Sequence, residues 1–132
     1  MSRQDLARAF VSTQSFRTDP NGFRLASGAV SSYYIDCRAL MAYPGARQLV
    51  ARLAVQAIHN LPIDCVGGLE IGAIAIATAI SDEAYRGTPR HEWRTFVVRK
   101  QMKAQGLGKL VEGVDVKGED LDKTQRAAIE VE

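Results

Sequence analysis

The order of apolar runs between Ile63 and Val98 constrains the fold of this chain more than any other feature. Residues 63–67 read as a short strand and residues 73–85 as a helix, with a glycine-marked loop between them. A second β-branched run, residues 95–98, follows the helix. Strand, helix and strand in this order form a βαβ unit, whose two strands should be parallel and adjacent. The sequence therefore predicts an α/β fold.

The residues before this unit predict a helix, a hairpin and a second helix. Apolar residues recur at helical spacing in about residues 4–15, and residues 19–22 are dense in turn formers. Residues 23–25 and 33–37 then read as two strands that pair as a hairpin across a turn at Ser27 and Gly28. Proline favours the first helical position, so a long helix is expected from Pro44 to about residue 58.

The length of the chain fits one domain, in which we distinguish three parts. The chain has 132 residues, of which 46% are hydrophobic, so it can bury a core. Residues 1–43 form the helix and hairpin, residues 44–113 the βαβ core with a basic loop, and residues 114–132 a tail of different character. We find no third core strand, and two parallel strands are too few for a stable sheet. The hairpin and tail, or a second chain, should complete it.

Composition excludes several classes of partner. The formal net charge is only +2, which argues against nucleic acid, and no apolar run reaches the length of a membrane span. The N-terminus has no continuous apolar segment of the kind a signal peptide needs, so we expect no export. Cys37 and Cys65 lack the spacing of a metal site or a disulfide scaffold. We expect free thiols and a cytoplasmic protein.

A basic, glycine-bearing segment follows the second strand of the βαβ unit. It comprises residues 99–109, here called the basic flap, and carries Arg99, Lys100, Lys103 and Lys109. Gly106 and Gly108 give it conformational freedom. One interpretation is a solvated charged face, the usual role of a charge run. The other is a cationic cover that closes over an anionic ligand and excludes water.

A second loop belongs to the same unit. Residues 67–72, here called the glycine loop, join the first strand to the helix and can present backbone N–H groups and the positive end of the helix dipole to a phosphate. Glycines at such a position can also serve only steric needs. Glu70 is unusual in a phosphate cradle; it can accept hydrogen bonds from a sugar or a basic side chain, or cap the helix. Ligands of α/β sheets bind beyond the carboxyl ends of the strands, so the two loops should face one site.

Four segments of this chain resemble orotate phosphoribosyltransferase, a member of the type I phosphoribosyltransferase family. The resemblance covers about residues 10–118, and the basic flap is its most specific part. The segments are FRLASG (residues 23–28) with YYID (33–36), GGLEIGAIAIA (67–77), VRKQMK (98–103), and Gly106 followed by KLVEG (109–113).

The resemblance implies a fold, a reaction and a set of site residues. The fold would be an incomplete Rossmann-like parallel sheet under a helix-hairpin hood. The reaction would transfer phosphoribosyl from phosphoribosyl pyrophosphate to orotate, with Mg²⁺, in a homodimer that shares the basic flap across subunits. Lys100 and Lys103 would be catalytic, and no residue is assigned to the metal. The substrate-binding residues would be Tyr33, Tyr34, Gly68, Leu69, Glu70, Ile71, Gly72, Arg99, Lys100, Lys103 and Lys109.

The sequence also departs from the family pattern. Gln105 stands where the family usually has a histidine, and Ala29 where it often has a basic residue. The family continues into an apolar strand that ends in paired acidic residues, followed by a Thr-Thr-Gly-type loop for the ribose 5-phosphate. This chain instead reads DLDKTQR at residues 120–126. We therefore expect it to lack that phosphate loop and one core strand.

These departures leave three hypotheses open. The chain is an orotate phosphoribosyltransferase whose missing portion another chain supplies, or whose sequence has lost it. Alternatively, it is a non-catalytic relative that binds pyrophosphate-type anions or serves as a regulatory or dimer partner subunit. The third hypothesis is a truncated remnant that folds only by exchanging strands with another copy.

Overall fold

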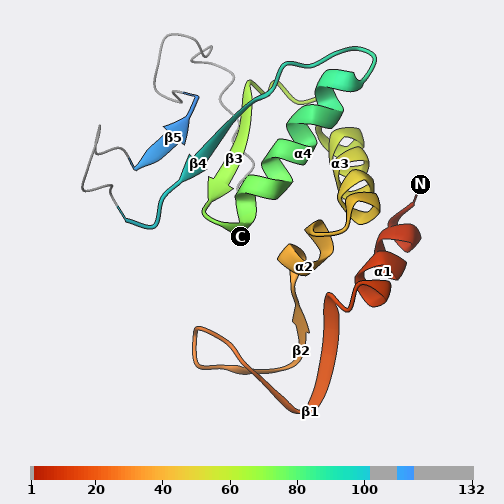
Figure 1. Ribbon diagram of the computed structural model, residues 1–132, viewed down its shortest axis with the longest axis vertical. Helices are drawn as coiled ribbons and strands as arrows, with labels where there is room; N and C mark the ends of the chain where they lie inside the picture. Colours follow the sequence, from red (N-terminus) through yellow and green to blue (C-terminus); the bar gives the residue numbers. More distant parts are fainter. Residues whose placement is uncertain (1, 102–109, 115–132) are drawn as a thin grey trace. The chain divides into compact units, whose positions relative to one another are not determined.

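A computed structural model of the chain describes residues 2–101 and 110–114. The chain divides into two compact units, Met1–Leu49 and Val50–Glu132. Figure 1 shows the order of helices and strands along the chain. Two of the flap lysines, Lys103 and Lys109, lie outside the described residues, as do the departure at Gln105 and residues 115–132. The prediction of a divergent tail therefore stays a prediction.

The first unit contains the predicted helix and hairpin. Helix α1 (Arg3–Ser12) begins at a capping box, in which Ser2 and Asp5 each bond the other's backbone N–H. Strands β1 (Phe16–Arg24) and β2 (Val30–Ile35) pair antiparallel, and the chain turns between Leu25 and Ala29. The hairpin and its turn are confirmed.

The bounds of the two hairpin strands differ from the prediction. Residues 19–22 do not end a helix but lie inside β1, where the register shifts between Thr18 and Phe23, so their turn chemistry forms an irregularity within the strand. β2 ends at Ile35 rather than residue 37. The Asp36 carboxylate accepts the N–H groups of Arg38 and Ala39 and thereby starts helix α2 (Cys37–Met41), which the sequence analysis missed.

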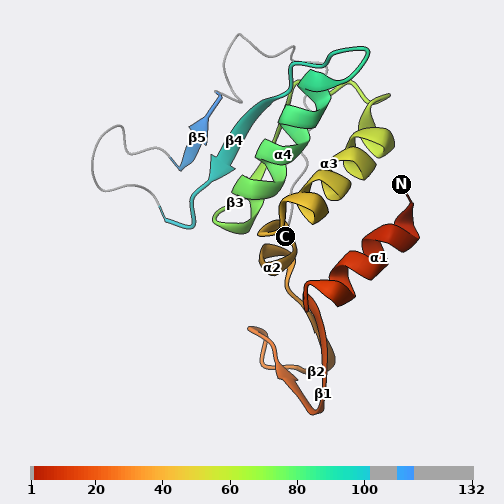
Figure 2. The ribbon, with the colours of Figure 1, turned by 45° about the vertical axis from the view of Figure 1, so that its right-hand side comes forward.

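The βαβ unit is confirmed. Helix α3 (Pro44–Ile58) precedes it, and β3 (Cys65–Leu69), α4 (Gly72–Arg86) and β4 (Arg94–Val98) form it. β3 and β4 pair parallel in an unbroken register that joins Cys65 to Arg94 and Leu69 to Val98. Figures 1 and 2 show α4 lying along β3 and β4, with its buried face formed by Ala73, Ile76, Ala77, Ile80 and Ala84.

A third strand in this sheet was not predicted. β5 (Val111–Gly113) pairs antiparallel with β4, so the sheet order is β3-β4-β5 and the sheet is mixed rather than purely parallel. Val111 and Val114 pack against the buried side chains of Cys65 and Phe96. Three residues are too few to show a strand period in sequence, and the pairing forms because the chain returns to β4 after the flap.

The first core strand is also displaced from its predicted position. β3 runs two residues further than expected and includes Gly67 and Gly68, which are both buried. A Cβ atom at Gly67 would lie 2.2 Å from the backbone oxygen of Phe96, so close packing of the strands requires glycine there. None of the helices in the described residues combines the length and apolar character that a membrane crossing needs.

Candidate active site

The bases of the glycine loop and the basic flap meet at the carboxyl ends of β3 and β4. The strands end side by side because Leu69 pairs with Val98. Two hydrogen bonds then link the segments that follow. The backbone N–H of Glu70 donates to the carbonyl oxygen of Val98 at 2.8 Å, and the N–H of Lys100 donates to Glu70 Oε1, also at 2.8 Å. The prediction that the two loops share one edge of the sheet is confirmed for these bases.

The glycine loop is shorter than predicted. Gly67, Gly68 and Leu69 belong to β3, and Gly72 already begins α4, so Glu70 and Ile71 alone connect the two elements. Their peptide bond is cis. Gly68 and Leu69, both predicted to bind substrate, are therefore strand residues, with Gly68 buried and Leu69 exposed. The correction follows from the pairing with β4, which extends β3 through glycines that sequence alone assigns to a loop.

The N-terminus of α4 has the features that suit an anion. Ile71 occupies the N-cap position without a side-chain hydrogen bond to the helix, and the first turn carries no acidic residue. The first N–H groups of a helix have no partner inside the helix, and they lie at the positive end of its dipole. Lys100 is exposed, and its backbone is bonded to the loop that starts this helix. An anion at this end would therefore encounter backbone donors and a cation.

Arg99 lies in the stem of the basic flap. Its backbone N–H donates to the carbonyl oxygen of Leu110 at 2.7 Å and so extends the β4–β5 pairing by one step. Its guanidinium lies 3.9 Å from Glu112 Oε1, on the returning strand. Its Nε atom is buried and makes no hydrogen bond within the part of the chain that the structure describes. The prediction that Arg99 binds substrate stays a prediction. In the structure its side chain joins the two sides of the stem.

Glu112 was missed by the sequence analysis, although it carries a weak signal. Arg99 is the first residue of the flap, and Glu112, of opposite charge, follows shortly after its end. An antiparallel return of the chain can bring two such positions together. The contact between Glu70 and Lys100 has no signal of this kind. It joins a side chain to a backbone group 30 residues away.

Tyr33 and Tyr34 belong to the first unit, and adjacent strand positions place them on opposite faces of the hairpin. The ring centres of Tyr34 and Phe23 lie 5.8 Å apart. The Arg17 guanidinium lies 5.9 Å from the centre of the Tyr34 ring. Tyr33 stacks on Phe16 with ring centres 6.1 Å apart and is 52% exposed. Tyr33 is therefore the ring with more free surface to offer a planar ligand.

The described residues contain no group of three His, Cys, Asp or Glu side chains that could hold a metal ion. Magnesium commonly binds through one or two carboxylates together with the phosphates of a substrate and retained waters.

Comparisons with known proteins identify relatives of this chain. No family model matches the chain. An orotate phosphoribosyltransferase from Tropheryma whipplei is 38% identical over 117 residues, which are 88% of this chain and 52% of that protein. UMP synthase from Leishmania donovani superposes with a TM-score of 0.73 at 30% identity, over 98% of this chain and 25% of that one.

A third comparison concerns a structure with a bound ligand. The orotate phosphoribosyltransferase of Mycobacterium tuberculosis, in complex with 5-phospho-α-D-ribosyl 1-diphosphate, matches with a TM-score of 0.57 and 29% identity. The match covers 84% of this chain and 57% of that one. The chain belongs to the orotate phosphoribosyltransferase family. It spans about half the length of the Tropheryma relative.

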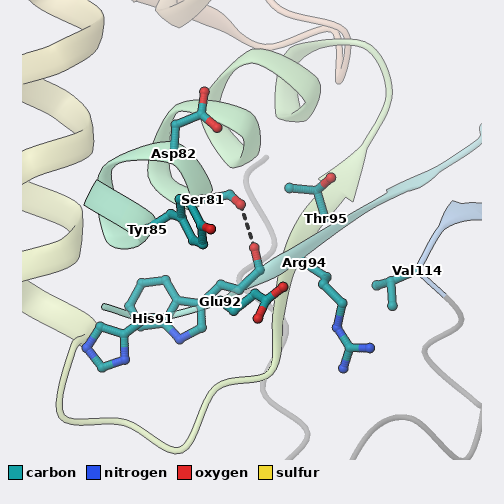
Figure 3. A pocket seen from close by; sticks show the side chains of 9 residues that line it. Ser81, Asp82, Tyr85, His91, Glu92, Arg94, Thr95 and Val114 are labelled. Atoms are coloured by element: carbon teal, nitrogen blue, oxygen red, sulfur yellow. Dashed lines mark hydrogen bonds between the residues drawn. The ribbon is translucent and has the colours of Figure 1, made fainter. Parts of the chain in front are cut away.

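One cavity in this family member lies away from the two loops. It measures about 520 Å³ and sits at the start of β4, beside the last turns of α4. Figure 3 shows the Ser81 hydroxyl donating to the backbone oxygen of Trp93 at its wall. None of the predicted site residues lines it. The remaining lining residues carry mixed charge and are Asp82, Tyr85, His91, Glu92, Arg94, Thr95 and Val114.

Proposed function

We propose that this chain is an orotate phosphoribosyltransferase that transfers the phosphoribosyl group of phosphoribosyl pyrophosphate to orotate, a step of pyrimidine nucleotide biosynthesis. One observation carries the proposal. The uncapped N-terminus of α4 and the base of a cationic flap meet at one edge of the sheet, held by the bond between Lys100 and Glu70. The family membership and the related structure with bound phosphoribosyl diphosphate support it.

The chemistry of this transfer suits the groups at that edge. Cleavage of the glycosidic bond to pyrophosphate leaves a cation-like ribose and a departing anion. The protein must hold the anion with positive groups and orient the base, a task of electrostatics and positioning. The N–H groups at the start of α4 would bind pyrophosphate, Lys100 and Lys103 would neutralise its developing charge, and Tyr33 would contact orotate.

Three finer features belong to the same proposal. Magnesium would arrive on the oxygens of phosphoribosyl pyrophosphate, where it offsets their charge, because magnesium commonly binds through substrate phosphates together with one or two carboxylates. The active assembly would be a homodimer that shares the flap, as the resemblance implies. The two free thiols, Cys37 and Cys65, fit a reducing cytoplasm.

The substitution Lys100→Ala tests the anion site. We expect calorimetric titration with magnesium pyrophosphate to show binding to the wild-type chain, and binding about tenfold weaker to K100A, because one charge-assisted contact is lost. The matched control is Arg90→Ala. Arg90 is an exposed cation whose guanidinium lies 4.4 Å from the centre of the Tyr85 ring, outside both loops. Equal losses in both variants, or no heat with the wild-type chain, would contradict the proposal.

Turnover decides between catalysis and binding alone. The purified chain is incubated with orotate, phosphoribosyl pyrophosphate and magnesium while the absorbance of orotate is followed. Loss of absorbance supports the enzyme. Pyrophosphate binding without any turnover at high protein concentration would instead identify a non-catalytic relative, and would show that this chain alone does not catalyse the reaction.

A further inference from the structure

Glu70 places a negative charge in the loop that precedes the α4 N-terminus. A carboxylate directed at a bound phosphate would repel it, most strongly at contact distance in a partly buried site. The structure shows a different use of this side chain. Oε1 of Glu70 accepts the backbone N–H of Lys100, while the backbone N–H of Glu70 donates to the carbonyl oxygen of Val98. The residue is therefore bonded on both sides to the chain that leaves β4.

We propose that Glu70 is a positioning residue that fixes the base of the basic flap against the start of α4. The inference rests on the proposed function, in which Lys100 acts on the pyrophosphate. Through its bond to the Lys100 N–H, the Glu70 carboxylate sets where the Lys100 side chain begins its path toward the anion. Glu70 itself does not touch the substrate.

The local hydrogen bonds explain why one contact at this place matters. The pairing of β4 with β3 ends at Val98, and the pairing of the flap stem ends with the bond from Arg99 to Leu110. Lys100 and Gln101 are exposed. Within the described residues, the bond to Glu70 is the only hydrogen bond that Lys100 makes, and it carries the ordered backbone one residue beyond the stem.

An ordered backbone at Lys100 favours anion binding for an entropic reason. With its backbone bonded to Glu70, Lys100 is already held beside the start of α4, whereas without this bond its backbone would have to be ordered when the anion binds. Ordering the backbone of a residue carries an entropic cost. Preorganisation removes this cost from the binding step and from the reaction barrier.

Two other roles for Glu70 make different predictions. A residue that contacts substrate through its charge would be equally impaired by Glu70→Gln and Glu70→Ala. A residue that positions Lys100 would be largely rescued by E70Q, because the amide oxygen of glutamine still accepts an N–H bond. If Glu70 had only a general effect on fold stability, its replacement would change amide hydrogen exchange uniformly throughout the βαβ unit.

Amide hydrogen exchange of the full 132-residue chain, read at Lys100 with phosphate-free buffer, tests the bond directly. We expect exchange at Lys100 to be faster by about tenfold in E70A, the effect of losing one hydrogen bond to a charged acceptor, and faster by a smaller factor in E70Q. Exchange in the middle of β4 should not change. Asp82→Asn is the control, since Asp82 is an exposed carboxylate on α4 near the opposite end of the sheet.

Kinetics and pyrophosphate titration complete the test. If the chain turns over, kcat should fall at least tenfold in E70A with a smaller change in the KM for orotate, and E70Q should recover most of the rate. Unchanged exchange at Lys100 in E70A, or equal losses in E70Q and E70A, would overturn the role of Glu70. Absence of turnover and of pyrophosphate binding in the wild-type chain would overturn the proposed function, while the exchange result would still decide whether Glu70 orders Lys100.

Discussion

The two halves of the glycine loop, residues 67–69 and residues 70–72, both contain glycine but differ in structure. The first half is paired strand, and Gly67 lies so close to Phe96 that a Cβ atom does not fit. The second half is a two-residue connection and the first residue of α4, with an uncapped helix terminus and a carboxylate bonded across to Lys100. One half serves the packing of the sheet, and the other forms the candidate site.

This difference shows that glycines in a phosphate-loop pattern need not all serve the phosphate. Gly67 is required because the backbones of β3 and β4 approach each other closely, whatever ligand binds. The donors available to an anion come instead from the first turn of α4. A second contrast supports the same point. The cavity at the start of β4 has volume but no helix N-terminus on its wall, whereas the loop edge includes the first turn of α4.

Substitution in the packed half should have the largest effect. Gly67→Ala places a methyl group against the Phe96 backbone oxygen, which cannot move away as a flexible side chain could. We expect a loss of about 3 kcal/mol in the free energy of unfolding, at the upper end of the range for overpacked cores. Urea unfolding followed by circular dichroism measures it. Gly45→Ala is the control, since its Cβ has open space within α3 and should not destabilise. Equal stability of G67A and G45A would remove the distinction between the halves.

Substitution in the site half should separate stability from binding. Ile71 is 66% exposed at the N-cap of α4, so replacing it costs little burial. Ile71→Asp should raise the free energy of unfolding by about 0.5 kcal/mol through the helix dipole, and should weaken pyrophosphate binding about tenfold through repulsion. Ile71→Asn provides the uncharged comparison and should affect binding much less. Unaltered binding in I71D, measured by calorimetry, would place the anion elsewhere.

The smallest expected effect concerns Cys65, which lies two residues before the packed half on the same strand, β3. Burial, with a further contribution from Asp64, raises the pKa of the Cys65 thiol. Below the pKa of the thiol in the unfolded chain, about 8.5, the thiol is protonated in both the folded and the unfolded chain, and the stability is at its full value. Above it, the unfolded thiol ionises first, so stability falls as pH rises.

The variant Cys65→Ser removes this titration. We expect the wild-type chain to lose more stability than C65S between pH 7.5 and pH 9.5, as measured by urea unfolding at each pH. Cys37→Ser gives a second comparison, because burial also raises the pKa of Cys37. Parallel pH profiles for wild type and C65S would show that the thiol titrates alike in the folded and unfolded chains.

Sequence patterns located α3, α4 and β4. Proline at the start of α3, the apolar spacing of α4 and the β-branched run of β4 each gave the correct element, because each is a local property of a few successive residues. The meeting of the two loop bases also followed from the parallel βαβ order. The helix at Cys37 was missed, although Asp36 is an ordinary N-cap residue, because the apolar run through Ile35 was extended past its end.

What the sequence alone determined is the order of elements and the edge of the sheet at which a ligand should bind. The tertiary structure decided where β3 ends, that β5 joins the sheet, and which backbone group Glu70 bonds. The physical reason is the same in each case. Periodicity and capping depend on neighbours along the chain, whereas strand register, close backbone approach and the bond between Glu70 and Lys100 depend on residues that only folding brings together.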